Sequence, residues 1–199
     1  MHPKIKDLSA LLLAAPLVAG CVNAQRDDVS SVSLREPNPA PSSIRVTLDG
    51  LDAGSRVASD SVFSGFGCTG KNRSLGVRWT PVPAAKSYAL ILHDPDAPTG
   101  VGFFHWVVLD LPSETTALPV GASGSALPAG TVEAHTDFGA AGYGGPCPPP
   151  GPPHRYEVTV YAVNQRSLGL GVGATAALAR FMLSQHSLAI GRARATYSR

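Results

Sequence analysis

The sequence predicts a mainly β protein, an antiparallel β-sandwich with one or two short helices near the C-terminus. Gly (21) and Pro (18) together make up 39 of the 199 residues, which disfavours a helical bundle or a coiled coil. Short runs rich in β-branched and aromatic residues alternate with Pro- and Gly-rich segments. With 44% hydrophobic and 15% charged residues, the chain is too apolar to be disordered and long enough to bury a core.

Four segments have the composition and periodicity of strands. Residues 44–48 alternate apolar and polar side chains and end at an Asp-Gly pair. Residues 86–93 and 104–111 are β-rich runs, each closed by Pro or Asp-Pro. The clearest strand covers residues 156–163, where period-two spacing puts four side chains on one face: Tyr156, Val158, Val160 and Ala162.

A single long segment, residues 174–189, has the periodicity of a helix. Four of its residues recur at helical spacing: Leu178, Phe181, Gln185 and Leu188. Gly191 would end this helix, and residues 194–197 would form a last strand. The preceding stretch, residues 169–173, contains three glycines, but their spacing does not match a dinucleotide-binding loop, so we interpret it as a flexible loop.

Residues 1–20 have the features of a lipoprotein signal peptide. Two lysines precede an apolar stretch over residues 8–18 that is too short to span a bilayer comfortably. The residues that follow, Val18-Ala19-Gly20-Cys21, resemble the bacterial lipobox, in which the cysteine is acylated and becomes the new N-terminus. The alternative is an ordinary signal peptide that happens to be followed by a cysteine.

Residues 21–43 would then be a lipidated cysteine and a flexible tether rich in Pro and Ser, because this stretch has no apolar periodicity. The second residue of the mature chain is Val22 rather than Asp, which by resemblance to the sorting rule of Gram-negative lipoproteins indicates the outer membrane, facing the periplasm. We therefore predict an exported protein held at the membrane by its lipid anchor, with a folded domain over residues 44–199.

Two cysteines remain once Cys21 is set aside, Cys68 and Cys147. An exported chain folds in an oxidising compartment, so we expect one disulfide between them, with two buried free thiols as the alternative. A metal site is less expected, because no CxxC and no close Cys/His pair occurs.

The charge and motif content exclude several functions. A net charge of +2 without any block of like charges does not indicate nucleic-acid binding. The HExxH, P-loop and GxSxG signatures are absent. We therefore expect no cofactor, no metal and no nucleic-acid partner.

Two motifs carry the remaining chemistry. The first is Asp94-Pro95-Asp96-Ala97-Pro98, followed by His105-Trp106-Val107-Val108. The second covers residues 142–149 (Gly-Tyr-Gly-Gly-Pro-Cys-Pro-Pro) and is followed by His154-Arg155-Tyr156.

Each motif also has a purely structural interpretation. An Asp-Pro pair commonly ends a strand and starts a turn, which would account for Asp94. His105 has aromatic and apolar neighbours, where a histidine is more often a hydrogen-bonded core residue than a functional one. The Gly- and Pro-rich stretch cannot be a helix or an inner strand, so it predicts a rigid loop that could wall a pocket, with a cis X-Pro bond as one option.

Together these residues resemble the phosphatidylethanolamine-binding protein family, which includes the Raf kinase inhibitor proteins of animals, and they are most similar to its bacterial Raf-kinase-inhibitor-like branch. Further matches at residues 70–74, 86–90 and 181–189 extend the resemblance over about residues 44–197. The resemblance implies a sandwich of the family's type with a small anion pocket at one edge. It also implies six ligand-binding residues: Asp94, His105, Gly145, Pro146, His154 and Tyr156.

The sequence departs from the family pattern at several positions. Leu75 stands where the family has Pro, Asp110 where it usually has Asn, and Phe103 and Phe104 where Trp is common. The C-terminal helix that gates the pocket of animal members has no clear counterpart. These differences bear on ligand specificity rather than on the fold.

The resemblance implies a lipid-anchored binding protein whose pocket takes phosphate-like head groups, such as phosphoethanolamine, from a small molecule or a lipid. The alternative is an inhibitor or regulator of a kinase or protease partner. A hydrolase is less expected, because no nucleophile or metal set accompanies Asp94, His105 and His154, so we expect no enzyme. The oligomeric state stays open, with a homodimer as one option.

The three polar residues also predict how the pocket responds to pH. A carboxylate at Asp94 is expected to raise the pKa of His105 or His154 above about 6.5. An imidazolium would then bind the anion, and binding would be tightest at acidic pH.

Overall fold

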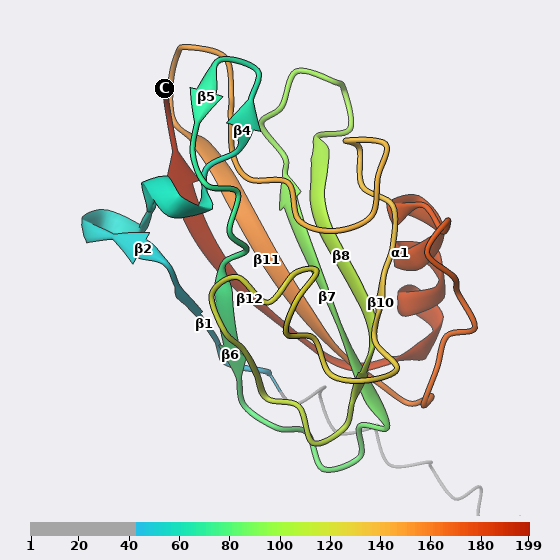
Figure 1. The fold of residues 1–199 in the computed structure, drawn as a ribbon. Helices are drawn as coiled ribbons and strands as arrows, with labels where there is room; N and C mark the ends of the chain where they lie inside the picture. The colour runs from blue at the N-terminus through green and yellow to red at the C-terminus, as the bar shows by residue number, and fades with distance from the viewer. Residues whose placement is uncertain (1–42) are drawn as a thin grey trace, which may run out of the picture. The chain divides into compact units, whose positions relative to one another are not determined.

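The structure is a computed structural model that describes residues 43–199 (Figure 1). The predicted signal peptide, Cys21 and all but the last residue of the tether lie outside the described residues. Within residues 43–199 no helix is long and apolar enough to cross a membrane.

A seven-stranded sheet forms the centre of the fold. Its long strands are β7 (Ser87–Asp94), β8 (Phe103–Pro112), β11 (His154–Val163) and β12 (Ser187–Tyr197). Three short strands, β2 (Leu51–Asp52), β3 (Arg56–Val57) and β10 (Val132–Glu133), complete the order β10-β8-β7-β11-β12-β3-β2. The pairs are antiparallel except β12 and β3, which run parallel at Thr196 and Arg56, so the sheet is mixed at this edge.

A second, smaller layer confirms the predicted sandwich. It consists of β1 (Val46–Asp49), β6 (Gly76–Trp79) and β9 (Ala117–Leu118), in the order β1-β6-β9. The segment between β1 and β6 contains two short 3₁₀ turns, at Ala53–Ser55 and Ser59–Ser61. It also contains a small hairpin of β4 (Ser64–Gly65) and β5 (Cys68–Thr69), which lies at the same end of the molecule as the C-terminus (Figure 1).

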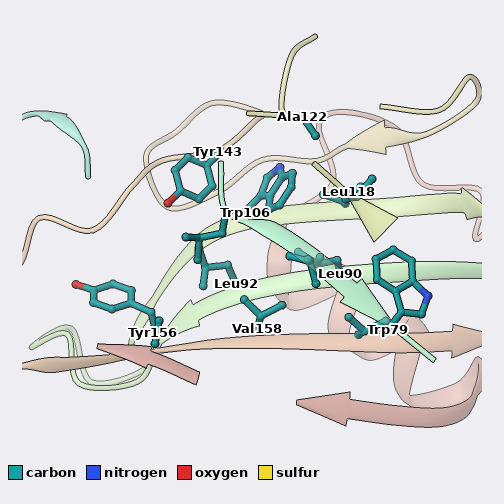
Figure 2. Packing of buried hydrophobic residues seen from close by; sticks show 14 of the residues in the cluster. Trp79, Leu90, Leu92, Trp106, Leu118, Ala122, Tyr143, Tyr156 and Val158 are labelled. Carbon is teal, nitrogen blue, oxygen red and sulfur yellow. The ribbon is translucent and has the colours of Figure 1, made fainter. Parts of the chain in front are cut away.

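The main core lies between the two layers (Figure 2). The predicted face of β11 is confirmed, because its four alternating residues from Tyr156 to Ala162 are all buried in this core. Trp106 on β8 and Leu90 on β7 are fully buried beside them. Burying a side chain of this size contributes roughly 1.5–3 kcal/mol, so this alternation is a main source of the stability of the fold.

The helix is shorter than predicted. Helix α1 (Ala176–His186) is capped at its N-terminus by Thr175, whose hydroxyl accepts a hydrogen bond from the Leu178 N–H at 3.2 Å, and β12 follows at Ser187 without a loop. Gly191 does not end the helix: it lies inside β12 opposite Val160, where a Cβ would come within 2.2 Å of the Ile44 carbonyl oxygen. The ladder with β11 and this close approach of two backbones override the local helical pattern.

The buried face of α1 also differs from the predicted stripe. Ala176, Ala179 and Leu183 are buried against the face of the sheet opposite β1 and β6, and they form a second core cluster with residues of β7, β8 and β11 (Figure 1). Leu178 and Phe181, from the predicted stripe, are 44% and 61% exposed. The two small alanines let the helix approach the sheet closely, and Leu183 is the large residue that this face buries.

Candidate functional site

A pocket of about 160 Å³ opens at the end of the large sheet where β7 ends and β8 and β11 begin. Its polar lining consists of Asp94, Thr99, His105, His154 and Tyr156. Its apolar lining consists of Phe66, Ala97, Pro98, Phe103, Phe138, Cys147, Pro148 and Pro149. Four of the six residues implied by the resemblance are therefore brought together in one cavity.

The strand registers explain why these four residues meet. Asp94 pairs with Phe103 across β7 and β8, and His93 pairs with Glu157 across β7 and β11, so the end of β7 lies beside the beginnings of both neighbours. Side chains two apart in a strand point to the same face. His154 and Tyr156 thus share one face of β11. On β8 the register with β7 shifts between Leu92 and His93, so His105 is the extra residue between the pairs Leu92–Trp106 and His93–Phe104, and its side chain lines the same pocket.

Asp94 and His154 form a hydrogen-bonded pair in which the carboxylate is buried. Asp94 is 3% exposed, and its Oδ2 accepts a hydrogen bond from His154 Nδ1–H at 2.8 Å. Its Oδ1 accepts from the Asp96 backbone N–H at 2.9 Å, within the turn that the Asp-Pro pair predicts. The carboxylate thus fixes the His154 tautomer and leaves His154 Nε2 free to face a ligand.

His105 is a neutral histidine, contrary to the expectation that its pKa would be raised. Burial lowers its pKa to about 4, while the Gly144 hydrogen bond and the charge of Asp94 act more weakly in the opposite direction. Its Nδ1–H donates to the Gly144 carbonyl at 2.7 Å. Nε2 of this ring therefore carries a lone pair and is an acceptor, because a carbonyl can only accept. The ring packs edge-on against three aromatic rings: Phe103, Phe138 and Tyr156.

Tyr156 carries a hydroxyl without a partner. The side chain is fully buried, and its oxygen has no hydrogen-bond partner among the described residues. Burial raises its pKa, and the carboxylate of Asp94, which lies nearby but not in ordinary hydrogen-bond geometry, acts in the same direction, so the hydroxyl remains protonated and can donate. In Figure 2 the hydroxyls of Tyr156 and Tyr143 point toward the same end of the core, but the Tyr143 hydroxyl donates to the Ser61 carbonyl at 2.9 Å. A buried donor without a hydrogen bond costs folding free energy, so the Tyr156 hydroxyl is a candidate donor to a ligand.

Gly145 and Pro146 lie behind the lining and hold the Gly- and Pro-rich loop in place. The Gly145 N–H donates to Asn72 Oδ1 at 2.7 Å, and the Pro146 carbonyl accepts from the Phe63 N–H at 3.1 Å. Asn72 also donates from Nδ2 to the Tyr143 carbonyl at 3.0 Å. The loop thus presents its later residues, from Cys147 to Pro149, to the pocket. All peptide bonds of the described residues are trans, so the cis X-Pro option is wrong.

The predicted disulfide between Cys68 and Cys147 is present, with the two Cα atoms 6.0 Å apart, which excludes the alternative of free thiols. It ties the β4–β5 hairpin to the Gly- and Pro-rich loop over residues 142–149, which we call the pocket loop. Phe66 at the tip of this hairpin lines the pocket although it is 73% exposed, and its carbonyl accepts from Arg199 Nη1 at 2.9 Å. No sequence pattern identifies Phe66 or Phe138 as pocket residues, because isolated aromatics in Gly-rich segments have no periodicity.

A second pair, Asp96 and Arg155, joins the turn after β7 to the start of β11. Arg155 contacts the carboxylate of Asp96 through Nε at 2.8 Å and Nη2 at 2.5 Å, and its backbone N–H donates at 2.8 Å. The hydrogen bond from the Arg155 side chain lowers the pKa of Asp96 to about 2. Because the guanidinium of Arg155 is paired with Asp96 in this way, its charge is already compensated next to the pocket.

Two departures from the family pattern have structural roles. Asp110, at φ 58°, accepts hydrogen bonds from Ser167 Oγ at 2.5 Å and the Leu168 N–H at 2.9 Å, away from the pocket. Phe103 lines the pocket, whereas Phe104 belongs to the second core cluster and stacks on His93. Among residues 43–199 no three His, Cys, Asp or Glu side chains come together as metal ligands.

The fold and the pocket define a class of small β-sandwich proteins with a buried carboxylate, two histidines and a tyrosine at one end of the sheet. A profile of the family described as phosphatidylethanolamine-binding protein matches residues 53–198. The chain belongs to this family.

Several relatives place the chain among the bacterial members. It is 41% identical over 150 residues to the UPF0098 protein YbcL of Escherichia coli K12, covering 73% of this chain and 82% of YbcL. It is 39% identical over 158 residues to YbhB of the same organism, covering 78% of this chain and all of YbhB. The crystal structure of YbcL, described as a new member of the mammalian family, superposes with a TM-score of 0.75 at 39% identity and covers 78% of this chain and 98% of YbcL.

A further relative bears on export. LppC of Mycobacterium tuberculosis, which carries a provisional lipoprotein name, is 35% identical over 133 residues, covering 65% of this chain and 61% of LppC.

Proposed function

We propose that this protein binds a small molecule or lipid through a phosphate-like head group in the pocket, and that it is not an enzyme. One observation carries the proposal: the buried hydroxyl of Tyr156 lacks a partner and belongs to a cavity that already contains an oriented histidine. A phosphoryl oxygen in the cavity would accept from this hydroxyl and satisfy it. Membership of the phosphatidylethanolamine-binding protein family supports the same class of ligand.

The pocket residues support binding rather than turnover. A covalent mechanism needs a nucleophile next to a base. The sulfur of Cys147 is in the disulfide, and the Thr99 hydroxyl donates to the Gly102 carbonyl. The remaining groups can orient and hold an oxyanion, and none of them is paired as a nucleophile with its base.

Replacing Tyr156 with phenylalanine tests the proposal. We expect Tyr156→Phe to bind phosphoethanolamine at least about tenfold more weakly, because a hydrogen bond to a charged oxygen is lost. We expect the free energy of unfolding to stay the same or rise, because the native hydroxyl has no partner among the described residues. Calorimetric titration and denaturant unfolding measure the two effects separately.

Tyr143→Phe is the matched control, since its hydroxyl does have a partner, the Ser61 carbonyl. This variant should lose about 1 kcal/mol of stability and keep its affinity for phosphoethanolamine. If Tyr156→Phe binds as tightly as the native protein, the pocket does not hold the phosphoryl group and the proposal fails.

We also propose that the domain is carried at the membrane by an acylated Cys21, in the outer membrane of a Gram-negative cell. The lipobox-like sequence and the lipoprotein name of one relative support this. We expect Cys21→Ser to move the protein from the membrane fraction to the soluble periplasmic fraction, because the acyl chains are lost. Cell fractionation measures the change, and Cys68→Ser, which leaves Cys21 in place, should remain with the membrane. A Cys21→Ser variant that stays in the membrane fraction would contradict the anchor.

A further inference from the structure

We propose that the pocket recognises a proton on its ligand. It binds a phosphomonoester as the monoanion, which still carries one P–OH group, more tightly than anions of the same shape and charge that carry no such group. The inference rests on the proposed function, and it narrows the ligand class. It follows from the count of acceptors and donors that the pocket presents.

Asp94 contributes the first acceptors. Each of its oxygens takes one protein N–H, from His154 and from Asp96, and an ionised carboxylate keeps further lone-pair positions on both oxygens. Among residues 43–199 no Lys or Arg lines the pocket, and the nearby Arg155 is held by Asp96. An unprotonated oxyanion in the cavity would thus place its lone pairs beside a buried carboxylate.

His105 contributes another acceptor. Its Nδ1–H is used by the Gly144 carbonyl, so Nε2 offers a lone pair to the cavity that the ring lines. The titratable groups around this ring are Asp94 and His93 from β7 and Asp137 from the loop before the Gly-rich stretch. Burial outweighs their influence and holds the pKa of His105 at about 4, so this ring accepts at any pH above that value.

The pocket has fewer donors than acceptors. Tyr156 O–H is the donor without a partner, and His154 Nε2 donates only when the imidazole is protonated next to Asp94 and Asp96. A ligand that fits this set must therefore donate as well as accept. The phosphomonoester monoanion does both: its P–OH donates to Asp94 or His105, and a P–O⁻ oxygen accepts from Tyr156.

The ligand's own ionisation is one source of pH dependence. The second pKa of a phosphomonoester is about 6, so the fraction of monoanion falls about tenfold for each pH unit above about 7. Affinity is therefore expected to be highest on the acidic side and to fall as the ligand loses its second proton. His105 does not contribute to this change, since it is neutral throughout the range.

Comparing the binding of phenyl phosphate with that of phenyl sulfate separates the effect of the ligand's proton from the effect of its charge. Near pH 5.5 both are mainly monoanions with the same aryl group, and only phenyl phosphate carries an acidic proton. The aromatic lining, Phe66, Phe103 and Phe138, offers the same contacts to both. Calorimetric titration of the full chain should give at least about tenfold tighter binding of phenyl phosphate at pH 5.5, which corresponds to one lost charge-assisted hydrogen bond.

Asp94→Asn should remove the discrimination, because a carboxamide can donate to a sulfate oxygen where a carboxylate repels it. We expect the two affinities to come within about threefold of each other in this variant. Asp49→Asn is the control: it removes the same charge at an exposed ion pair with Arg78 that is not part of the pocket, and it should keep the full discrimination.

Three results would decide against the inference. Equal affinities at pH 5.5 would overturn the selection by a proton and leave the anion site in place. Binding of phenyl phosphate that stays constant from pH 5.5 to pH 8 would do the same. If neither phenyl phosphate nor inorganic phosphate binds at pH 5.5, both this inference and the proposed function are wrong.

Discussion

Gly145→Ala is expected to lower the free energy of unfolding by about 3 kcal/mol and to abolish binding in the pocket. A Cβ at this position would lie 2.2 Å from the Ser61 carbonyl oxygen and 2.6 Å from the Phe63 backbone nitrogen. Both atoms belong to backbone that cannot rotate away. The loop would have to move and would lose the hydrogen bond from Gly145 N–H to Asn72. Thermal or denaturant unfolding measures the loss.

Gly171→Ala is the matched control for this substitution. Apart from its two chain neighbours, no atom of the described residues lies within 4 Å of a Cβ at Gly171, so alanine there should be neutral or should stabilise by about 0.5 kcal/mol through the unfolded state. If the Gly145 and Gly171 variants have the same stability, the close packing of the pocket loop against residues 61–63 is not real.

Removing the disulfide is expected to have an effect of similar size. The Cys68→Ser/Cys147→Ser double variant should lose about 2–5 kcal/mol, because the bridge closes a long loop, joining residues 79 apart in the sequence. Binding should also weaken, because the β4–β5 hairpin that places Phe66 at the pocket is no longer tied to the pocket loop. Unfolding by denaturant and titration with phenyl phosphate measure the two effects.

The native protein treated with a reductant provides a second measurement that needs no substitution. It should unfold at the same denaturant concentration as the double serine variant. A double variant with native stability and native affinity would show that hydrogen bonds such as Asn72 to Gly145 hold the loop alone.

The sequence predicts well those features that depend on neighbours close in the chain. Period-two alternation identifies the buried face of β11, and the spacing of His154 and Tyr156 puts both on one face. The Asp-Pro pair predicts the turn in which Asp94 accepts from the Asp96 N–H. These features follow from local backbone geometry, which a short stretch of sequence specifies.

Features that depend on distant contacts are not predictable in this way. The end of α1 is set by the pairing of β12 with β11 and by the contact between Gly191 and Ile44, which are 147 residues apart (191 − 44). The role of Asn72 depends on carbonyl and amide groups 71 and 73 residues away. The neutral state of His105 depends on how deeply the finished fold buries it, and the sequence indicates only that Asp94 is near.

Three contacts restrict the conformation of the pocket loop. The Asn72 amide, the bridge to Cys68 and the Phe63 contact with Pro146 fix it from three sides, and its own prolines restrict the rest. Such preorganisation means that a ligand orders little of the chain when it enters, so most of its contact energy appears as affinity. A rigid wall also cannot adapt to a ligand of another shape. Changes of specificity among relatives with this loop would therefore come from the side chains that line it, and the path of the backbone would be retained.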